Sequence, residues 1–236
     1  MMLQQTQVAR VIPKYKSFLK KFPSVQALAQ APLRDVLLEW QGLGYNRRGM
    51  YLKKCAEKVT KDFAGKFPRD FKTLTSLPGI GPATAGDICA FAYNIPAVVI
   101  ETNIRAVFIH FFFAGKEKIS DTEILPLIEK TLDQENPREW YWGLFDYGAY
   151  LKSTKIKNPN HKSKHYIKQS PFKDSYRQKR AGLLRTLLQS PNKRYSRQEL
   201  KKILGYQAEI LSKLLSDLEK EGFIHKTQNN TYFIKS

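Results

Sequence analysis

Hydrophobic positions in the first 150 residues recur at helical spacing, and short polar turns separate the segments. The first segment, residues 3–21, predicts an amphipathic helix. Its apolar positions are Val8, Val11, Ile12, Tyr15, Phe18 and Leu19. A short helix follows "FPSV", and Pro32 starts another that runs through Trp40. The sequence "GLGY" at residues 42–45 interrupts the pattern before a helix expected from about 47 to 60.

The residues that follow, up to Leu151, also show helical spacing of apolar positions. "FPRDFKTLTSLPGIGPATAGDICAFAY" predicts a helix, a tight glycine turn and a second helix. Ser120 and Glu123 form a capping box ahead of a helix over residues 124–132. "PREWYWGLFDYGAYL" predicts one more, strongly apolar helix. The first two thirds of the chain are therefore expected to be helical throughout.

The pattern changes after Leu151. "KSTKIKNPNHKSKHYIKQSPFKDS" has few apolar residues and many lysines, which predicts an extended basic connector. We then expect a helix through residues 183–188, a helix after the capping box of Ser196 and Glu199, and a helix over 207–221. A β-hairpin around 228–230 completes the order of a winged helix. The predicted domains are residues 1–168, connector included, and residues 169–236.

Composition places the chain among globular proteins. It has 236 residues, of which 42% are hydrophobic and 12% aromatic, enough for real cores. No run approaches the ~18 apolar residues of a membrane span, and no signal peptide is seen, so we expect a cytoplasmic, nucleoid-associated protein without membrane contact. Cys55 and Cys89 are too few for a four-thiolate metal site and indicate no disulfide scaffold.

Charge narrows the function. The net charge is +19 and the pI about 9.8. Residues 152–202 hold 16 basic and 2 acidic residues, so most of the excess lies there. Such a basic stretch is typical of a nucleic-acid binder, although a merely soluble cationic surface is the plain alternative.

The segment Leu77–Ala85, "LPGIGPATA", carries the clearest local chemistry. Two glycines two residues apart permit a hairpin too tight for Cβ atoms and point successive backbone N–H groups outward. The N-terminal end of the following helix is also positive, so a phosphate could bind without a charged side chain. This is a helix–hairpin–helix pattern, although a helix-terminating glycine turn gives similar strings.

Glu101 lies in the apolar run "VVIETNIRAV" at residues 98–107. An ionised carboxylate in such surroundings is costly unless it is paired. The residue could be a helix cap, a structural ion-pair partner or a group that does chemistry, and the sequence pattern alone leaves all three open.

The segment "MLQQTQVARVIPKYKSFLKKFPSVQALAQAPLRDVLLEWQGLGYNRR" together with "FPRDFKTLTSLPGIGPATAGDI" resembles the A/G-specific adenine DNA glycosylases of the helix–hairpin–helix superfamily, which also contains endonuclease III. The resemblance runs from Met2 to about Leu151. It implies a mainly α, two-lobed glycosylase fold, here with a small C-terminal winged-helix-like domain. The family flips a mispaired or damaged base out of duplex DNA and cleaves its glycosidic bond. We expect a monomer that needs no cofactor.

Single positions carry over from the family. Gln5 resembles the glutamine that enters the duplex, and Tyr45 the tyrosine that wedges into the base stack; the plain alternatives are a surface glutamine and a core tyrosine. Glu101 aligns with the catalytic carboxylate, which would stabilise oxocarbenium character on the sugar. The resemblance also implies DNA contacts at Gly79, Gly81, Ala83 and Asn103.

Two departures concern the acid groups. The family has Asp where Glu101 stands, and one methylene can move a carboxylate by about 1.5 Å, while misplacement on the order of 1 Å can cost 100-fold in rate. The family's acidic residue just before "MLQQTQ", which protonates the leaving base, lies outside this sequence. A shortened chain or a misassigned start codon is the expected reason.

Two further departures concern the cluster and the nucleophile. The four iron–sulfur cysteines of most relatives are absent, and Lys152 stands where the first would fall. His161 and His165 are interpreted as phosphate-facing or solvent residues rather than metal ligands, and the connector lysines could contact DNA instead. Ala83 occupies the position of the Schiff-base lysine of bifunctional relatives, which predicts a monofunctional glycosylase that uses water.

The C-terminal segment does not resemble the nudix-like domain that reads 8-oxoguanine in the family. Its candidate recognition helix, residues 207–221, has a net charge of −2, so the helix containing Arg177, Lys179, Arg180 and Arg185 is the better candidate for DNA contact. The leading hypothesis is removal of adenine opposite 8-oxoguanine or guanine. The alternatives are a thymine or uracil mismatch glycosylase, and a catalytically weak binder of lesions or abasic sites.

Overall fold

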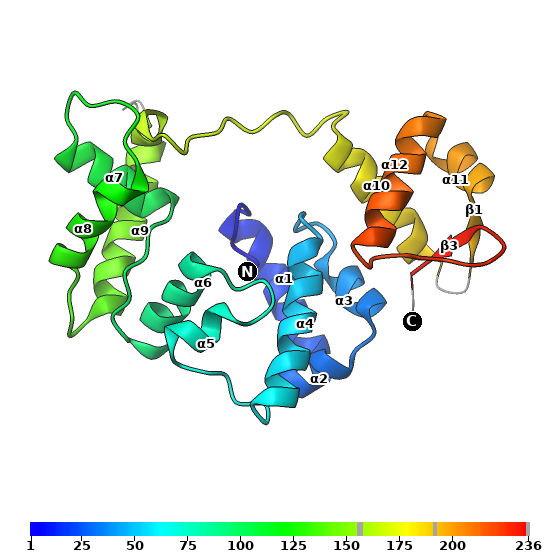
Figure 1. The fold of residues 1–236 in the computed structure, drawn as a ribbon, viewed down its shortest axis with the longest axis horizontal. Coiled ribbons are helices and arrows are strands. Elements are labelled where there is room, and N and C mark those ends of the chain that lie inside the picture. Colours follow the sequence, from blue (N-terminus) through cyan, green and yellow to red (C-terminus); the bar gives the residue numbers. More distant parts are fainter. Residues whose placement is uncertain (155–157, 191–192, 235–236) are drawn as a thin grey trace. The chain divides into compact units, whose positions relative to one another are not determined.

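The computed structural model describes residues 1–154, 158–190 and 193–234 of the chain, which are mainly helical with one small sheet (Figure 1). The N-terminal helices are α1 (Val8–Lys21), α2 (Val25–Gln30), α3 (Leu33–Trp40) and α4 (Arg47–Asp62). The central helices are α5 (Phe71–Thr75), α6 (Pro82–Asp87), the π-helix η1 (Ile88–Ala92), α7 (Thr102–Phe112), α8 (Asp121–Thr131), α9 (Pro137–Ser153) and the 3-10 helix η2 (Pro159–Lys162). The C-terminal elements are α10 (Tyr176–Gln189), β1 (Tyr195–Ser196), α11 (Arg197–Leu204), α12 (Ala208–Lys220), β2 (His225–Lys226) and β3 (Thr231–Phe233).

The chain forms two compact units. Unit 1 consists of residues 1–66 together with residues 170–236, and unit 2 consists of residues 67–169. The division at residue 168 that the sequence suggested stays a prediction. The units instead group the C-terminal helices with the N-terminal ones, because these two segments share a hydrophobic core.

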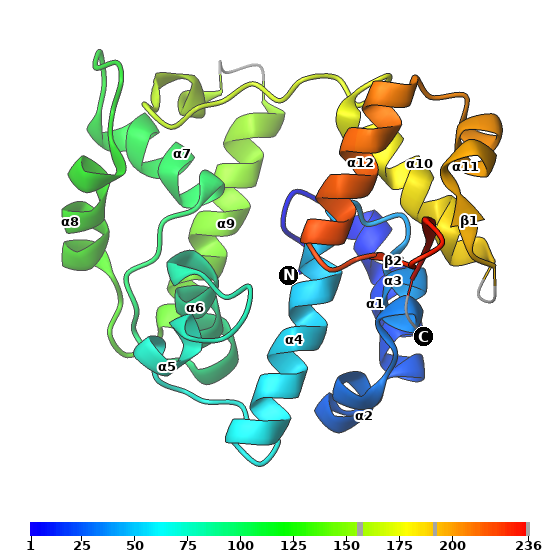
Figure 2. The ribbon, with the colours of Figure 1, turned by 45° about the vertical axis from the view of Figure 1, so that its right-hand side comes forward.

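Unit 1 has two connected cores. One lies among α1–α4, where Phe18 packs edge-on against Phe22 and Trp40. The other consists of the leucines of α10 and α12 with Phe223, and it includes Leu37 of α3 and Met50 of α4. Figure 2 shows α10, α11 and α12 together with the labelled strands β1 and β2. The antiparallel sheet has the order β1-β3-β2.

A charged cluster reinforces the second core of unit 1. The carboxylate of Glu221, directly after α12, accepts two hydrogen bonds from Arg47 at the start of α4 and two from Arg180 of α10. Glu221 and Arg180 side chains are only 17% and 18% exposed. The two guanidinium groups lower the pKa of Glu221 against the opposing effect of burial.

Among the described residues of unit 2, a core lies between α7, α8 and α9 and includes Ile104, Ile124 and Tyr141. α7 and α9 approach closely because Gly148 has no side chain. A Cβ there would lie 2.4 Å from the carbonyl oxygen of Asn103. The start of α7 is therefore fixed against the middle of α9.

The structure confirms the predominantly helical class and most of the helices expected from spacing. Glu123 accepts a hydrogen bond from the backbone N–H of Ser120 at 3.0 Å, and the second capping box, of Ser196 and Glu199, is also present. The hairpin around residues 228–230 joins β2 and β3. In the described part of the chain no helix is long and apolar enough to span a membrane.

The predicted extended connector is partly folded. Residues 155–157 lie outside the described residues, but η2 follows them and a bridge pairs Ile119 with Ser163. Ile119 donates to Lys162 and Lys164 donates back to Ile119, at 2.9 and 2.8 Å. The sequence lacked the apolar periodicity that would have indicated this, because the segment is held by hydrogen bonds from its backbone and from the side chain of Asn160.

Candidate nucleic-acid interface and active site

The glycine turn of "LPGIGPATA" forms a tight hairpin in unit 2. Gly79 has φ +75°, a left-handed conformation that favours glycine. Gly81 caps α6 with φ −86°, and a Cβ added there would have open space around it. Neither backbone conformation nor packing within unit 2 therefore requires glycine at position 81, whereas close approach of a bound group would. Ala83, in the first turn of α6, is exposed.

Glu101 caps α7. Its Oε1 accepts hydrogen bonds from the backbone N–H groups of Asn103 and, at 2.9 Å, Ile104. Both bonds use one oxygen. Burial raises the pKa of Glu101, although the two backbone bonds and the positive charges of Lys152 and Arg105 act in the opposite direction. The side chain is therefore both a cap and a half-buried carboxylate with a perturbed pKa.

The segment between η1 and Glu101 is held on two sides. The hydroxyl of Tyr141 on α9 donates to Ala97 at 2.7 Å and accepts from the N–H of Val99 at 3.0 Å. A Cβ at Gly86 of α6 would lie 2.2 Å from Val99 Cγ2, so α6 packs directly on this segment. The helix after the glycine hairpin and the segment carrying Glu101 are thus neighbours.

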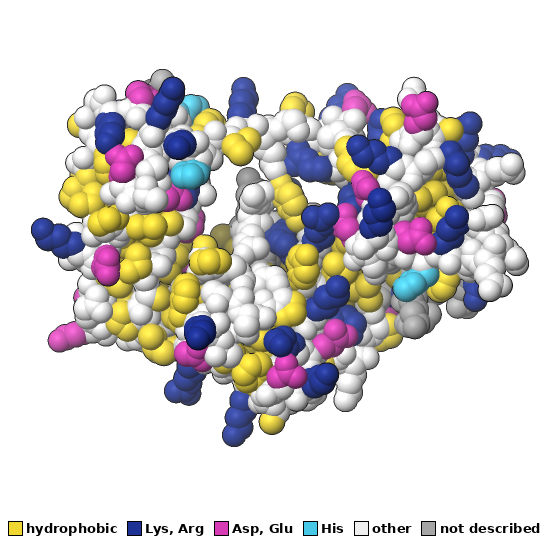
Figure 3. All heavy atoms as spheres, in the orientation of Figure 1, with side chains coloured by type: hydrophobic (Ala, Val, Ile, Leu, Met, Phe, Trp, Pro, Cys, Tyr) yellow, Lys and Arg dark blue, Asp and Glu magenta, His cyan; other side chains and the backbone are white. Residues whose placement is uncertain are grey.

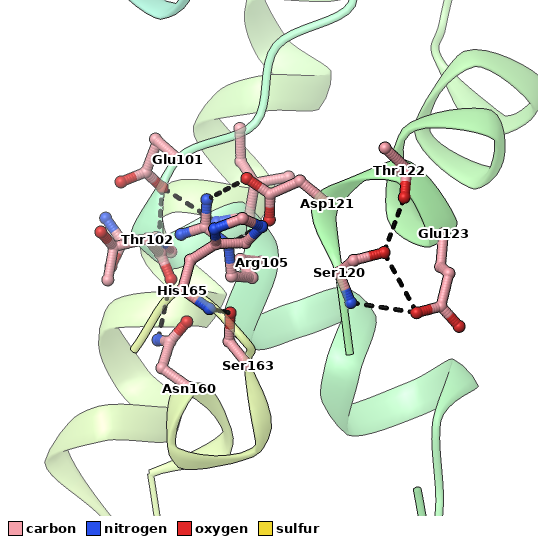
Figure 4. Close-up of polar contacts among 12 residues, drawn as sticks. Glu101, Thr102, Arg105, Ser120, Asp121, Thr122, Glu123, Asn160, Ser163 and His165 are labelled. Atoms are coloured by element: carbon pink, nitrogen blue, oxygen red, sulfur yellow. Dashed lines mark hydrogen bonds and ion pairs between the residues drawn. The ribbon is translucent and has the colours of Figure 1, made fainter. Parts of the chain in front are cut away.

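The start of α7 is also tied to α8 and η2, as Figure 4 shows. Arg105 makes two hydrogen bonds of 2.7 Å to the carboxylate of Asp121. Asn160, which is 4% exposed, donates its side-chain amide to the carbonyl of Thr102 at 3.0 Å. These contacts fix the helix terminus that positions Glu101.

A second carboxyl group lies beside Glu101. Asp87 ends α6 and is half-buried, and its Oδ1 is buried without a hydrogen-bond partner among the described residues. Burial, followed by the negative charge of Glu101, raises the pKa of Asp87 to about 6. Asn103 has a similarly buried and unpartnered Oδ1 in the first turn of α7.

In unit 1, the guanidinium of Arg48 joins the loop of Gln5 to the turn of Tyr45. It donates to Met1, Met2, Gln4 and Thr6 in the first loop, and to Leu43 and Gly44 in the turn. Gln5 and Tyr45 both have left-handed backbones, with φ of +54° and +46°. Such conformations are uncommon outside glycine and collect at functional sites. The structure therefore brings these two predicted DNA-entering residues together around one cation.

Tyr45 is 42% exposed, so it is not a core tyrosine. The guanidinium of Arg48 lies 5.4 Å from the centre of its ring, and Arg177 of α10 donates to its hydroxyl at 3.3 Å. Lys and Arg side chains are spread over the C-terminal helices on the face shown in Figure 3. Arg180 of the same helix is bound to Glu221 instead.

Sequence reasoning missed several residues of these sites, namely Arg48, Asp87, Arg105, Asp121 and Asn160. Asp87 has a detectable signal, since it is a lone acid in the apolar stretch "ATAGDICAFAY". The other four residues bind partners 16 or more positions away or bind backbone carbonyl groups, so no local pattern of side chains in the sequence marks them. Among the described residues no group of three or more His, Cys, Asp or Glu could hold a metal ion.

Comparison with known families defines the class of this protein. Residues 1–133 match the family described as HhH-GPD superfamily base excision DNA repair protein, and this is more than half of the chain. The chain therefore belongs to the HhH-GPD superfamily.

Named relatives are similar over most of the same region. Adenine DNA glycosylase of Buchnera aphidicola subsp. Baizongia pistaciae is 36% identical over 154 residues, which cover 64% of this chain and 43% of the relative. The Homo sapiens protein of the same name is 36% identical over 152 residues, covering 63% and 28%. The matched region thus spans less than half the length of these relatives.

Two solved structures share the fold. A thermostable thymine-DNA glycosylase superposes with a TM-score of 0.60 at 24% identity, covering 65% of this chain and 72% of that one. Endonuclease III in a non-covalent DNA complex gives 0.58 at 21% identity, covering 66% and 73%. At these identities the likeness shows the fold alone.

Proposed function

We propose that this protein is a base-excision-repair DNA glycosylase that removes adenine opposite 8-oxoguanine or guanine. The observation that carries the proposal is the half-buried carboxylate of Glu101 at the start of α7, on a segment packed against the helix that follows the glycine hairpin. Relatives named adenine DNA glycosylase support the choice of base.

In this mechanism the hairpin binds a DNA phosphate through backbone N–H groups at Gly79, Gly81 and Ala83, aided by the positive end of α6 and its continuation η1. The open space around Gly81 leaves room for a phosphate oxygen to approach the backbone. Gln5 and Tyr45 enter the duplex and occupy the stacking positions that the flipped nucleotide leaves. Arg48 holds both in their left-handed conformations before DNA binds.

Glu101 then stabilises the positive charge that develops on the sugar as the base departs. Oε1 is engaged with the backbone of α7, so Oε2 is the oxygen that faces this task. The added methylene relative to Asp is accommodated because the side chain folds back onto its own helix terminus. Asn103 could supply its buried amide oxygen to the same sugar or to the attacking water.

We also infer a monofunctional enzyme, in which water is the nucleophile. Ala83 has no amine with which to form a Schiff base. An efficient covalent complex with abasic DNA, trapped with borohydride, would contradict this. Lys152, whose pKa is lowered by burial although Glu101 opposes the shift, would then be the first amine to replace.

The C-terminal segment, residues 169–236, is proposed to be winged-helix-like and to extend the DNA interface. Its element order of helix, strand, two helices and a hairpin supports this, as does the bond from Arg177 to Tyr45. Its role would be to stiffen the wedge and contact the backbone of the strand opposite the flipped base.

The test uses duplexes with a single adenine opposite 8-oxoguanine or guanine, and thymine or uracil opposite guanine, followed by alkaline cleavage. We expect product from the adenine duplexes, and loss of about 100-fold or more in Glu101→Gln. Gln can accept the same two backbone bonds, so this variant keeps the cap and removes the charge. Glu101→Asp should remain active.

One observation favours a catalytically weak lesion or abasic-site binder, since Glu101 is already used as a cap. In that case Glu101→Gln would bind abasic DNA as the wild type does, and neither would release a base from any duplex. Release of thymine or uracil but not adenine would select the mismatch glycosylase instead.

A further inference from the structure

We propose that Asp87 is the proton donor to the departing base, and that it works as a pair with Glu101 on the opposite side of the Gly86–Val99 contact. This inference rests on the proposed glycosylase function and deepens it by naming a second catalytic carboxyl. It uses residues of unit 2 alone.

The position of Asp87 follows from the hairpin. It lies six residues after Gly81, and at about 1.5 Å of rise per residue it is about 9 Å along the helix from the phosphate-binding N–H groups. That is on the order of the length of one nucleotide, so a base attached near the bound phosphate could reach it. The helix changes to the π-helix η1 directly after Asp87, and such changes occur frequently at functional sites.

The carboxyl group of Asp87 has unused hydrogen-bonding capacity. Buried polar atoms are nearly always paired in folded proteins, yet Oδ1 of Asp87 is buried with no partner among the described residues. No salt bridge of Asp87 is present in the described part of unit 2 either. A group of this kind costs stability unless a ligand completes it.

The surroundings of Asp87 favour its protonated form at mildly acidic pH. Within unit 2, Asp87 interacts electrostatically with Glu101 and Tyr141. Glu101 in turn interacts with the positive charges of Lys152 and Arg105. Burial and the negative charge of Glu101 raise the pKa of Asp87 to about 6. Burial raises the pKa of Glu101 as well, while its two backbone hydrogen bonds and the cations Lys152 and Arg105 favour its ionised form. We assign the charge to Glu101, whose Oε1 accepts those two bonds, and the proton to Asp87, whose Oδ1 has no partner among the described residues. Two neighbouring carboxyls in different hydrogen-bonding environments can divide the roles of acid and anion.

Other donors in this part of unit 2 are committed elsewhere. Tyr141 donates to Ala97 and burial raises its pKa to about 12. Burial likewise raises the pKa of Cys89, which points its thiol at the carbonyl of Arg69. Asp87 is the remaining acid beside Glu101.

The chemical step balances with water as the sole co-reactant. The Asp87 O–H gives its proton to a ring nitrogen of the base while the bond from C1′ to the glycosidic nitrogen breaks and its electron pair stays with the base. Glu101 stabilises the resulting sugar cation. Water then bonds to C1′ and passes a proton to Glu101, and exchange with solvent returns both carboxyls to their starting states.

The first experiment is single-turnover excision between pH 5 and 8 for the wild type, Asp87→Asn and Asp87→Glu. Asp146→Asn is the matched control, because it removes the same charge from an exposed position on α9. General acid catalysis typically contributes at least 100-fold, so we expect Asp87→Asn to be about 100-fold slower near pH 5.5. The deficit should shrink to a few-fold by pH 8, where the wild-type Asp87 has lost its proton. Asp87→Glu should restore part of the rate and its pH dependence.

A purely structural role for Asp87 predicts a different result, namely loss by the same factor at every pH. That outcome overturns the inference. So does an Asp87→Asn variant whose pH profile equals that of the wild type while Glu101→Gln is inactive. Either result leaves the proposed glycosylase function intact. If the wild type releases no base from any of the duplexes, the function fails and the inference falls with it.

The second experiment needs no activity. In protein labelled with ¹³C at aspartate carboxyls, we expect the Asp87 signal to titrate well above the usual aspartate range. Its midpoint should fall in Glu101→Gln, because the neighbouring negative charge is gone. An Asp87 that titrates in the ordinary range, unchanged by Glu101→Gln, overturns the proposed pairing.

Discussion

Replacing Arg48 with methionine tests whether one guanidinium holds both DNA-entering residues of unit 1. Methionine keeps an unbranched apolar side chain but removes every donor. The carbonyl oxygens of Met1 and Leu43, which Arg48 now binds at 2.7 and 2.9 Å, would lose their partner. The loop of Gln5 and the turn of Tyr45 would lose their common link at the same time.

The size of the effect follows from the contacts. The three shortest bonds, to Met1, Gln4 and Leu43, are charge-assisted. We take them at about 1 kcal/mol each, below the usual 1.5–3 kcal/mol for charged groups, because water reaches a half-exposed site. The free energy of unfolding should therefore fall by up to about 3 kcal/mol, because strain released at Gln5 and Tyr45 offsets part of the lost bonding. Left-handed backbones at Gln5 and Tyr45 cost roughly 1–3 kcal/mol each, so both should relax, and affinity for DNA should fall about 10-fold, or 1.4 kcal/mol.

Urea unfolding gives the stability, and fluorescence anisotropy with an abasic-site duplex gives the affinity. Arg10→Met is the control, since it removes the same charge from an exposed residue of α1 and so reports the loss of general attraction to DNA. If Arg48→Met unfolds within 0.5 kcal/mol of Arg10→Met and binds the duplex equally well, the guanidinium does not hold the two loops.

Three further changes have expected outcomes. Gly81→Ala should change the melting temperature by no more than about 1 °C, because a Cβ there meets open space, and should weaken binding to abasic DNA about 10-fold by anisotropy. Binding equal to that of the wild type would refute a close contact between DNA and the backbone at Gly81. Glu221→Gln should cost about 2 kcal/mol of unfolding free energy at pH 7 by urea titration. The pKa of Glu221 is lowered in the folded protein, so its ion pairs stabilise the fold at pH values above the ordinary glutamate range, and this stabilisation is lost as pH falls below about 4. A difference in unfolding free energy between wild type and Glu221→Gln that is unchanged at pH 3 would contradict the ion-pair explanation. Asn160→Ala should lower the melting temperature by several degrees and slow excision by loosening the start of α7, whereas Asn158→Ala, which removes a shorter-range turn contact, should slow excision less.

Local patterns in the sequence were sufficient for most of the helices, the capping boxes and the glycine hairpin, although the helix predicted over residues 3–21 begins only at Val8. Each depends on residues within about four positions of one another, as at Ser120 and Glu123. The left-handed turn at Gly79 is similarly local. The choice of Glu101 as the candidate catalytic carboxylate also came from sequence, through its resemblance to a family motif, and its role stays a prediction.

Tertiary packing decided what surrounds these elements. Asp87 and Glu101 are 14 positions apart, and the packing of Gly86 against Val99 brings the segments that carry them together. Arg48 links residues 1–6 to residues 43–44 through backbone oxygens, which every sequence has and no pattern marks. The C-terminal helices share a core with Leu37 and Met50, although composition suggested a separate domain. Sequence alone determined the local elements because their energies arise between near neighbours, whereas the site depends on which distant surfaces bury one another.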